Sequence, residues 1–235
     1  MQLYYKSWQK YEVKIPKDTI ILGDNDLETL KSNKMYPIGY CWEVWTINKI
    51  LNEKPPFIDY SKNIIDVGAG LGEYCWLLPF NHAYAFEPNK TTLYKMHINL
   101  VLHDRVNDVD TYQSLLSDKK ETLRFDGFST NISNADSYND VVATDIVTTT
   151  LDSFDINNVG LIKIDVEGME ENVIRGGVGT IIRNNYPPIL FECWDVDDKG
   201  PTTERGERLF NLLSSMGYEI HVYWGDWETH LALHN

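Results

Sequence analysis

Alternate glycines follow an apolar run in the segment Asn63–Gly72, which reads Asn-Ile-Ile-Asp-Val-Gly-Ala-Gly-Leu-Gly. A strand that runs into a glycine-rich turn and then a helix is typical of ligand sites at the carboxyl edge of open α/β sheets. Glycine suits such a turn because a Cβ would keep the ligand away from the backbone. A dinucleotide loop has its third glycine one position later, where this chain has Glu73. The pattern therefore disfavours NAD, whose pyrophosphate would meet that carboxylate.

A second acidic residue, Glu87, ends the next β-rich run and precedes Pro88 and Asn89. Its two oxygens can accept hydrogen bonds from both hydroxyls of a ribose, although the same carboxylate could instead cap the following helix. Neighbouring parallel strands end at one edge of a sheet, so Glu87 and the glycine loop should face one crevice. S-adenosylmethionine has a ribose and an adenine but no phosphate, and it fits both features. Asp66 is then an acceptor for the ammonium of this ligand or an anchor for the loop.

Three carboxylates and a lysine occupy the corresponding ends of two later runs. Lys163 and Asp165 belong to one run, Glu167 follows it, and Glu192 lies near the end of the next. If the acceptor of the methyl group is a hydroxyl, which is a poor nucleophile, a nearby carboxylate, histidine or metal ion should take its proton. Crowded carboxylates have raised pKa values, and a divalent cation bound by Asp165 and Glu192 would relieve the same repulsion. The sequence leaves base and metal open, and also a merely structural role in which Asp165 caps the next helix.

The elements that must position these residues alternate along the chain. From residue 62 onward, β-rich runs alternate with segments of helical spacing, which is typical of parallel strands joined by helices in an α/β fold. A helix is predicted over Thr203–Met216, and loops with short hairpin strands are predicted over the polar residues 117–145. The predicted strands are Asn63–Val67, Ala83–Glu87, Val109–Leu115, Val159–Asp165, Ile189–Trp194, Tyr218–Trp224 and Thr229–His234.

Composition sets the class of protein. The chain has 235 residues, of which 43% are hydrophobic, enough for one compact domain. A net charge of −14 without a basic cluster disfavours nucleic acid and membrane surfaces and favours a neutral or cationic small molecule. Without an apolar run long enough to span a membrane or a signal-peptide pattern, we expect a cytoplasmic protein. Free, buried thiols are expected at Cys41, Cys75 and Cys193. The sequence does not indicate the oligomeric state.

Aromatic residues are concentrated at the two ends of the chain. We expect residues 1–60 to form a segment that packs on the sheet or covers the site, and residues 61–235 to form the catalytic domain. The aromatic residues of the first segment include Tyr4, Tyr5, Trp8, Tyr36, Tyr40, Trp42 and Trp45. Near the predicted site, Trp194 and Trp224 could stack on a sugar ring, although core packing explains them equally well.

Five motifs in order and spacing resemble the FkbM family of S-adenosylmethionine-dependent methyltransferases. The resemblance runs from about Gly39 to His234. The motifs are Asp66-Val67-Gly68-Ala69, Phe86-Glu87-Pro88-Asn89, Thr150-Leu151-Asp152-Ser153, Lys163-Ile164-Asp165-Val166-Glu167-Gly168-Met169-Glu170 and Leu231-Ala232-Leu233-His234. The resemblance implies a Rossmann-like sheet of seven mostly parallel strands with the last strand antiparallel. It also implies O-methylation, often of sugars or other small hydroxylated metabolites.

The resemblance adds site residues and leaves alternatives. It places the adenine at Ser114 and Leu115, and the cofactor set is then Asp66, Gly68, Ala69, Gly70, Gly72, Glu87, Pro88, Asn89, Ser114 and Leu115. The family usually has a small polar residue where Gly70 stands, and residues 1–60 match it poorly, so the acceptor is not specified. Two other functions stay open: a methyltransferase-like module that binds without turnover, and an NAD(P)-dependent oxidoreductase, which Glu73 disfavours.

Overall fold

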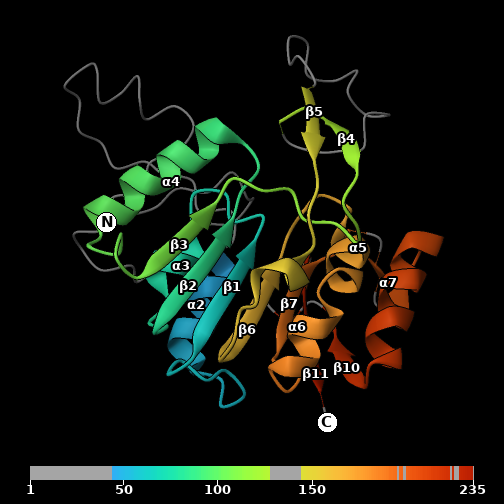
Figure 1. Ribbon diagram of the computed structural model, residues 1–235. Helices are drawn as coiled ribbons and strands as arrows, with labels where there is room; N and C mark the ends of the chain where they lie inside the picture. The colour runs from blue at the N-terminus through green and yellow to red at the C-terminus, as the bar shows by residue number, and fades with distance from the viewer. Residues whose placement is uncertain are drawn as a thin grey trace.

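A seven-stranded sheet forms the centre of the computed structural model, which describes residues 44–127, 144–194, 196–197, 200–222, 224 and 228–234 (Figure 1). The strand order is β10-β11-β7-β6-β1-β2-β3. All neighbouring strands are parallel except β11, the last strand of the chain, which is antiparallel to both β7 and β10. The strands are β1 (Asn63–Val67), β2 (His82–Phe86), β3 (Val109–Tyr112), β6 (Val159–Ile164), β7 (Ile189–Glu192), β10 (Tyr218–His221) and β11 (Thr229–His234). The predicted Rossmann-like α/β architecture is confirmed.

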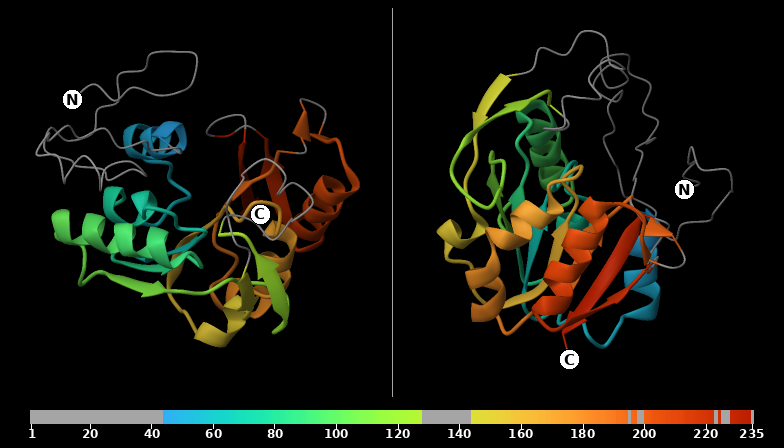
Figure 2. Two further views of the ribbon diagram at one scale, coloured as in Figure 1. Left: turned by 90° about the horizontal axis from the view of Figure 1, so that it is seen from above. Right: turned by 90° about the vertical axis from the view of Figure 1, so that its right-hand side faces the viewer.

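Helices cover both faces of this sheet, as the view from above shows (Figure 2). Because successive side chains of a strand point to opposite faces, Ile64 packs with one helix layer and Ile65 with the other. The central strands β1 and β6 are buried along their whole length, which explains their continuous apolar sequence. The first layer contains α2 (Val44–Glu53), α3 (Glu73–Leu77) and α4 (Lys90–Leu102), and the second contains α5 (Glu170–Arg175), α6 (Val178–Arg183), α7 (Glu204–Ser215) and the 3₁₀ turn η2 (Leu151–Phe154).

Element boundaries follow local chemistry. The predicted helix over residues 203–216 is α7, and the Thr203 side chain accepts a hydrogen bond from the Gly206 amide at its start. Gly217, with φ of +88°, follows its last turn in the left-handed region that glycine favours. Five predicted strands extended one to three residues too far, to Glu87, Leu115, Asp165, Trp194 and Trp224, because the chain leaves the ladder at the carboxyl edge before these residues.

Two hairpins accompany the main sheet. The antiparallel strands β4 (Thr122–Phe125) and β5 (Thr144–Val147) project from the carboxyl edge of the sheet (Figure 1). Strand β4 lies within residues 117–145, where short hairpin strands are predicted, and β5 begins there but continues to Val147. Residues 128–143 lie outside the described part. A smaller hairpin joins β8 (Val196–Asp197) and β9 (Gly200–Pro201).

Part of the segment 1–60 belongs to the first helix layer. Ile47 and Ile50 of α2, together with Ile58, are buried in the core with residues of β1 and α3. The aromatic residues predicted to cover the site lie outside the described residues or, for Trp45, have no described side chain, so their role stays a prediction.

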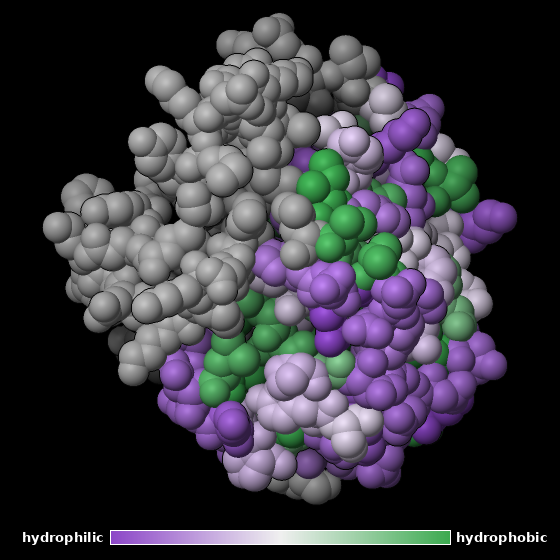
Figure 3. Space-filling model, turned by 90° about the vertical axis from the view of Figure 1, so that its left-hand side faces the viewer, coloured by the Kyte–Doolittle hydropathy of each residue, from purple (hydrophilic) through white to green (hydrophobic). Residues whose placement is uncertain are grey.

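The described surface is mostly polar. On the side that carries α4, apolar patches lie among polar residues (Figure 3). Val101 and Val106 are among the exposed large apolar side chains. Within the described part of the chain Cys75 and Cys193 form no disulfide and both are buried, as predicted, and Cys41 lies outside the described residues. Within the described chain, none of the helices combines the length and apolarity that crossing a membrane requires.

Candidate active site

The glycine loop leaves β1 with three left-handed residues. Gly68, Gly70 and Gly72 have φ of +74°, +54° and +82°. A Cβ on Gly68 would collide with the carbonyl oxygen of Asp165, and one on Gly72 would lie 2.8 Å from Cγ of Met96. A Cβ on Gly70 would have no heavy atom within 4 Å outside its own neighbours in the chain. Two glycines therefore pack against the protein, whereas the middle one faces open space that a ligand can enter.

Glu87 supports this loop from the end of β2. Its Oε2 accepts a hydrogen bond from the Gly70 amide at 3.1 Å, and its Oε1 accepts one from the Asn89 amide at 2.7 Å. Burial raises the pKa of Glu87 to about 7, although both hydrogen bonds oppose this shift. Each carboxylate oxygen can accept a further bond, so the predicted ribose contact is compatible with the loop support. The residues thus fit an adenosine ligand: open space at Gly70 beside a buried carboxylate.

The other predicted cofactor residues surround this point. The amides of Gly68 and Ala69 both donate to the carbonyl of Phe86, which ties the loop to β2. Asn89 caps α4, with its side chain accepting from the Thr91 and Thr92 amides. Pro88 and Ser114 are half-buried and Leu115 is buried, each beyond the carboxyl end of β2 or β3.

Asp66 lies inside the protein beneath the loop. It is fully buried, accepts a hydrogen bond from Cys75 Sγ at 3.3 Å and has its Oδ1 3.6 Å from Lys163 Nζ. Burial raises the pKa of Asp66, and the charge of Lys163 opposes that shift. The sequence leaves two roles open for Asp66: acceptor for the ammonium of the ligand, or anchor of the glycine loop. These buried contacts fit the anchor.

Lys163 connects the loop with the carboxylates at the end of β6. Its Nζ donates to the carbonyl of Gly68 at 3.0 Å and to Asp165 Oδ2 at 3.4 Å, and it is 3% exposed. The Asp165 amide also donates to the carbonyl of Val67 at 2.9 Å, which holds the ends of β1 and β6 together. Lys163 therefore contacts both the glycine loop of the predicted cofactor site and a carboxylate of the predicted acceptor site.

The three predicted carboxylates converge. Asp165, Glu167 and Glu192 each offer an oxygen within 4.8 Å of the others. Burial raises the pKa of Glu192 well above its ordinary value, and the charge and hydrogen bond of Asp165 raise it further. Burial and the charge of Asp165 likewise raise the pKa of Glu167. This set can accept a proton or offer ligands to a cation.

Glu170 shapes the turn that carries Glu167. Its Oε1 accepts hydrogen bonds from the amides of Val166 and Gly168 at 3.3 and 3.0 Å. Glu167 itself has φ of +55°, a left-handed conformation that few non-glycine residues adopt. Helix α5 begins at Glu170 without a side-chain cap, so Asp165 is not the cap that sequence reasoning left open. The sequence does not predict these hydrogen bonds, by which Glu170 holds the turn in place.

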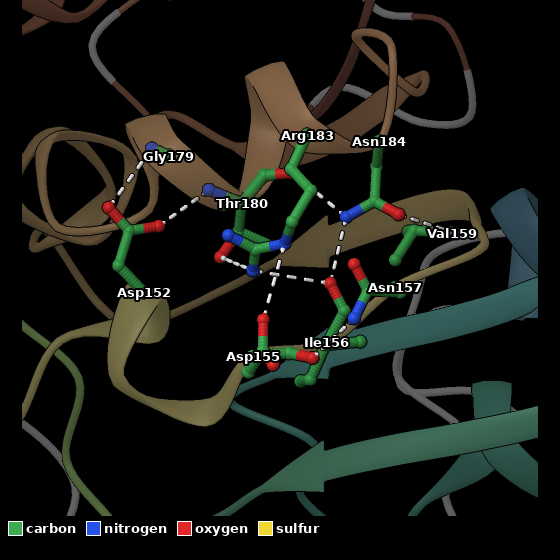
Figure 4. A network of polar contacts seen from close by, with 9 residues as sticks. All are labelled: Asp152, Asp155, Ile156, Asn157, Val159, Gly179, Thr180, Arg183 and Asn184. Carbon is green, nitrogen blue, oxygen red and sulfur yellow. Dashed lines mark hydrogen bonds and ion pairs between the residues drawn. The ribbon is translucent and has the colours of Figure 1, made fainter.

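The Thr150–Ser153 motif has a structural role. Asp152 accepts hydrogen bonds from the amides of Gly179 and Thr180 at 3.0 and 2.6 Å, at the start of α6 (Figure 4). In the same network, Asn184 accepts from the Val159 amide and donates to the carbonyl of Ile156. These contacts fix α6 against η2 and the beginning of β6, at the opposite end of that strand from Asp165.

Comparisons with known proteins agree with this geometry. The model of the Methyltransferase FkbM domain matches residues 66–220. No curated protein matches the chain. Among solved structures, a methyltransferase FkbM from Methylobacillus flagellatus is similar, with a TM-score of 0.53 and 17% identity over 73% of this chain and 43% of that one. An O-methyltransferase from Bacillus cereus, solved in complex with SAH, is similar with a TM-score of 0.53 and 11% identity over 94% and 92%.

At these identities the two structures show a shared fold, and this chain spans 43% of the length of the Methylobacillus protein. The family match covers more than half of the chain and begins at Asp66, directly before the glycine loop. It extends through the carboxylates of β6 and β7. The chain therefore belongs to the FkbM methyltransferase family.

Proposed function

We propose that this protein is an S-adenosylmethionine-dependent O-methyltransferase that acts on a hydroxyl of a sugar, a glycan or a similar small hydroxylated metabolite. The observation that carries the proposal is the link through Lys163 between the glycine loop and the carboxylates at the ends of β6 and β7. A site for the methyl donor and a group of proton acceptors thus lie side by side.

The proposed cofactor would supply a methyl group on a positively charged sulfur. Gly68, Gly70 and Gly72 would let it approach the backbone, and Glu87 would accept hydrogen bonds from its ribose. The acceptor hydroxyl would give up its proton as it takes the methyl group, and Asp165 would accept that proton. Lys163, with Nζ 3.4 Å from Asp165 Oδ2, holds this carboxylate in place. The enzyme's main contribution is alignment of the two reactants.

The surroundings of the cluster favour a neutral hydroxylated acceptor. Carboxylates accept hydrogen bonds from hydroxyl groups and repel anions, and the whole chain carries a net charge of −14. Trp194, which follows β7 two residues after Glu192, is 51% exposed and offers a ring on which a sugar can stack. Both features support a sugar over a phosphorylated acceptor.

Calorimetric titration tests the donor. We expect S-adenosylmethionine and S-adenosylhomocysteine to bind to the protein, and NADH not to bind. Binding of NADH alone would support an oxidoreductase, and binding of none of the three would support a module without this activity.

Transfer of a labelled methyl group to a panel of neutral sugars, phosphorylated sugars and amines then tests the acceptor. We expect Asp165→Asn to slow transfer by about two orders of magnitude or more while S-adenosylhomocysteine still binds. Unchanged turnover in this variant would show that another group takes the proton.

A further inference from the structure

The chain between β3 and η2 leaves the sheet as the β4–β5 hairpin and returns beside its point of departure. The Ser117 amide donates to the carbonyl of Thr149 at 2.8 Å, and the Thr149 amide donates to the carbonyl of Leu115 at 3.1 Å. Thr148, 1% exposed, donates through its hydroxyl to the carbonyl of Lys119 at 2.8 Å. The base of the hairpin is therefore fixed at Leu115, which borders the proposed cofactor site.

A second contact joins the hairpin to the residue that follows Glu87. Asn89 Nδ2 donates to the carbonyl of Gly127 at 2.9 Å, two residues beyond the end of β4. The same side chain caps α4 through Oδ1, and the backbone amide of Asn89 donates to Glu87 Oε1. Gly127 has φ of +97°, which only glycine adopts readily. Asn89 thus connects Glu87, the start of α4 and the hairpin through hydrogen bonds.

A third interaction reaches the acceptor side. Asp126, the neighbour of Gly127, lies close enough to Glu167 for its charge to raise the pKa of that residue, whereas Arg205 at the start of α7 lowers it. Two consecutive residues just after β4 are therefore linked to different halves of the site. Gly127 meets the cofactor half through Asn89, and the charge of Asp126 acts on Glu167 in the carboxylate half.

We propose that the β4–β5 hairpin is a wall of the active site and that Asn89 is the positioning residue that couples it to the bound cofactor. This inference rests on the proposed function, because the coupling runs through Glu87. Energetic coupling between two sites is reciprocal. If the hairpin helps to hold Glu87 in its ribose-binding position, a nucleoside bound at Glu87 must stabilise the hairpin by the same factor.

Amide hydrogen exchange with S-adenosylhomocysteine as the probe tests this coupling. In the wild-type protein, saturating probe should slow exchange at residues 122–127 and 144–147 by about fivefold or more. Asn89→Ser keeps a helix-capping oxygen but is too short to reach Gly127. In this variant the probe should still bind, with affinity reduced about fivefold or more, and its protection of the hairpin should be lost.

Two controls separate coupling from a general loss of structure. Asn63→Ser removes a side-chain hydrogen bond of the same length, from Nδ2 to the carbonyl of Asn157, at the opposite edge of the sheet. It should leave the probe-dependent protection intact. Asn89→Ala, which loses the cap as well, should raise exchange in α4 even without the probe. Equal probe-dependent protection in the wild type and Asn89→Ser would overturn the inference, whereas no binding to the wild type would overturn the proposed function itself.

Discussion

Asp66 and Lys163 are register partners on the neighbouring strands β1 and β6, and their charged atoms lie 3.6 Å apart beneath the glycine loop. Asp66 is fully buried and Lys163 is 3% exposed. A buried ion pair does not by itself stabilise a fold, because both charges lose their hydration. This ion pair instead fixes the position of Lys163, whose ammonium also donates to the carbonyl of Gly68 and to the carboxylate of Asp165.

Replacement of Lys163 by methionine should destabilise the fold strongly. The change leaves Asp66 buried without its countercharge, and loss of one partner of a buried pair lowers the free energy of unfolding by about 3–5 kcal/mol. Urea unfolding measures this difference. The double variant Asp66→Asn with Lys163→Met should recover part of it, because no uncompensated charge remains at Asp66. The exposed pair Lys62–Asp59 is the control, and Lys62→Met should change stability by less than about 1 kcal/mol. Equal effects of Lys163→Met and Lys62→Met would contradict the prediction.

Cofactor affinity should depend on pH through Glu87. Its pKa is about 7 in the protein without ligand, and ribose hydroxyls bind its charged form best. Affinity for S-adenosylhomocysteine should therefore be full well above pH 7 and fall as Glu87 is protonated, by roughly fifteenfold between pH 7 and pH 5.5. Calorimetry across this range avoids the titration of the ligand's own amino group near pH 8. Glu87→Gln should bind more weakly at pH 7 and lose this pH dependence. A wild-type affinity that stays constant across the range would show that Glu87 does not contact the ribose.

The sequence predicts those parts of the site whose residues lie within one continuous segment. Glycine spacing indicates the loop, and Glu87 follows its own strand directly. Asp165 and Glu192 could be expected to converge because parallel strands end at one edge of a sheet. The apolar spacing of residues 203–216 likewise predicts the helix α7.

Contacts between distant segments could not be predicted, because the side chains that meet depend on how the helices and loops pack in three dimensions. Asn99 of α4, which is fully buried, donates to the carbonyl of Leu71 at 3.1 Å, and nothing in the pattern of α4 signals that contact. The bond from Asn89 to Gly127 joins residues 38 positions apart. Cys75 was expected to be buried, whereas its bond to Asp66 depends on the angle at which α3 leaves the loop. The family resemblance implies that β11 is antiparallel, but nothing in the sequence places it between β7 and β10.

Glu170 should make the fold less stable at alkaline pH. Burial raises its pKa from 4.5 to about 7, so the stabilisation that proton uptake gives the folded state is complete below pH 4.5 and is lost as the pH rises through 7. Glu170→Gln keeps the oxygen that accepts from the amides of Val166 and Gly168. The variant should match the wild type near pH 4.5 and exceed its free energy of unfolding at pH 8 by up to about 3 kcal/mol.

The neighbouring Glu171 provides a control of opposite sign. Bonds from Arg175 and Arg208 hold its pKa below the ordinary value, so its contribution is present at neutral pH and is lost as the pH falls through that lowered pKa. Glu171→Gln should therefore be less stable than the wild type at pH 7. Urea unfolding at several pH values measures both variants. Glu170→Gln that is less stable than the wild type at every pH would contradict the assignment of Glu170.

The carboxylate cluster should act without a divalent cation. Asp165, Glu167 and Glu192 have the chemistry of a cation site, but Lys163 Nζ already pairs with Asp165 Oδ2 at 3.4 Å, and a cation bound there would face this positive charge. We therefore expect electron paramagnetic resonance to detect no Mn²⁺ bound more tightly than about 1 mM, and a chelator to leave methyl transfer unchanged. Tight Mn²⁺ binding that Glu192→Gln abolishes, together with turnover that Mg²⁺ or Mn²⁺ restores after chelation, would instead assign the cluster to a metal. Asp165 would then act as a ligand, and the proton of the acceptor would pass to another group.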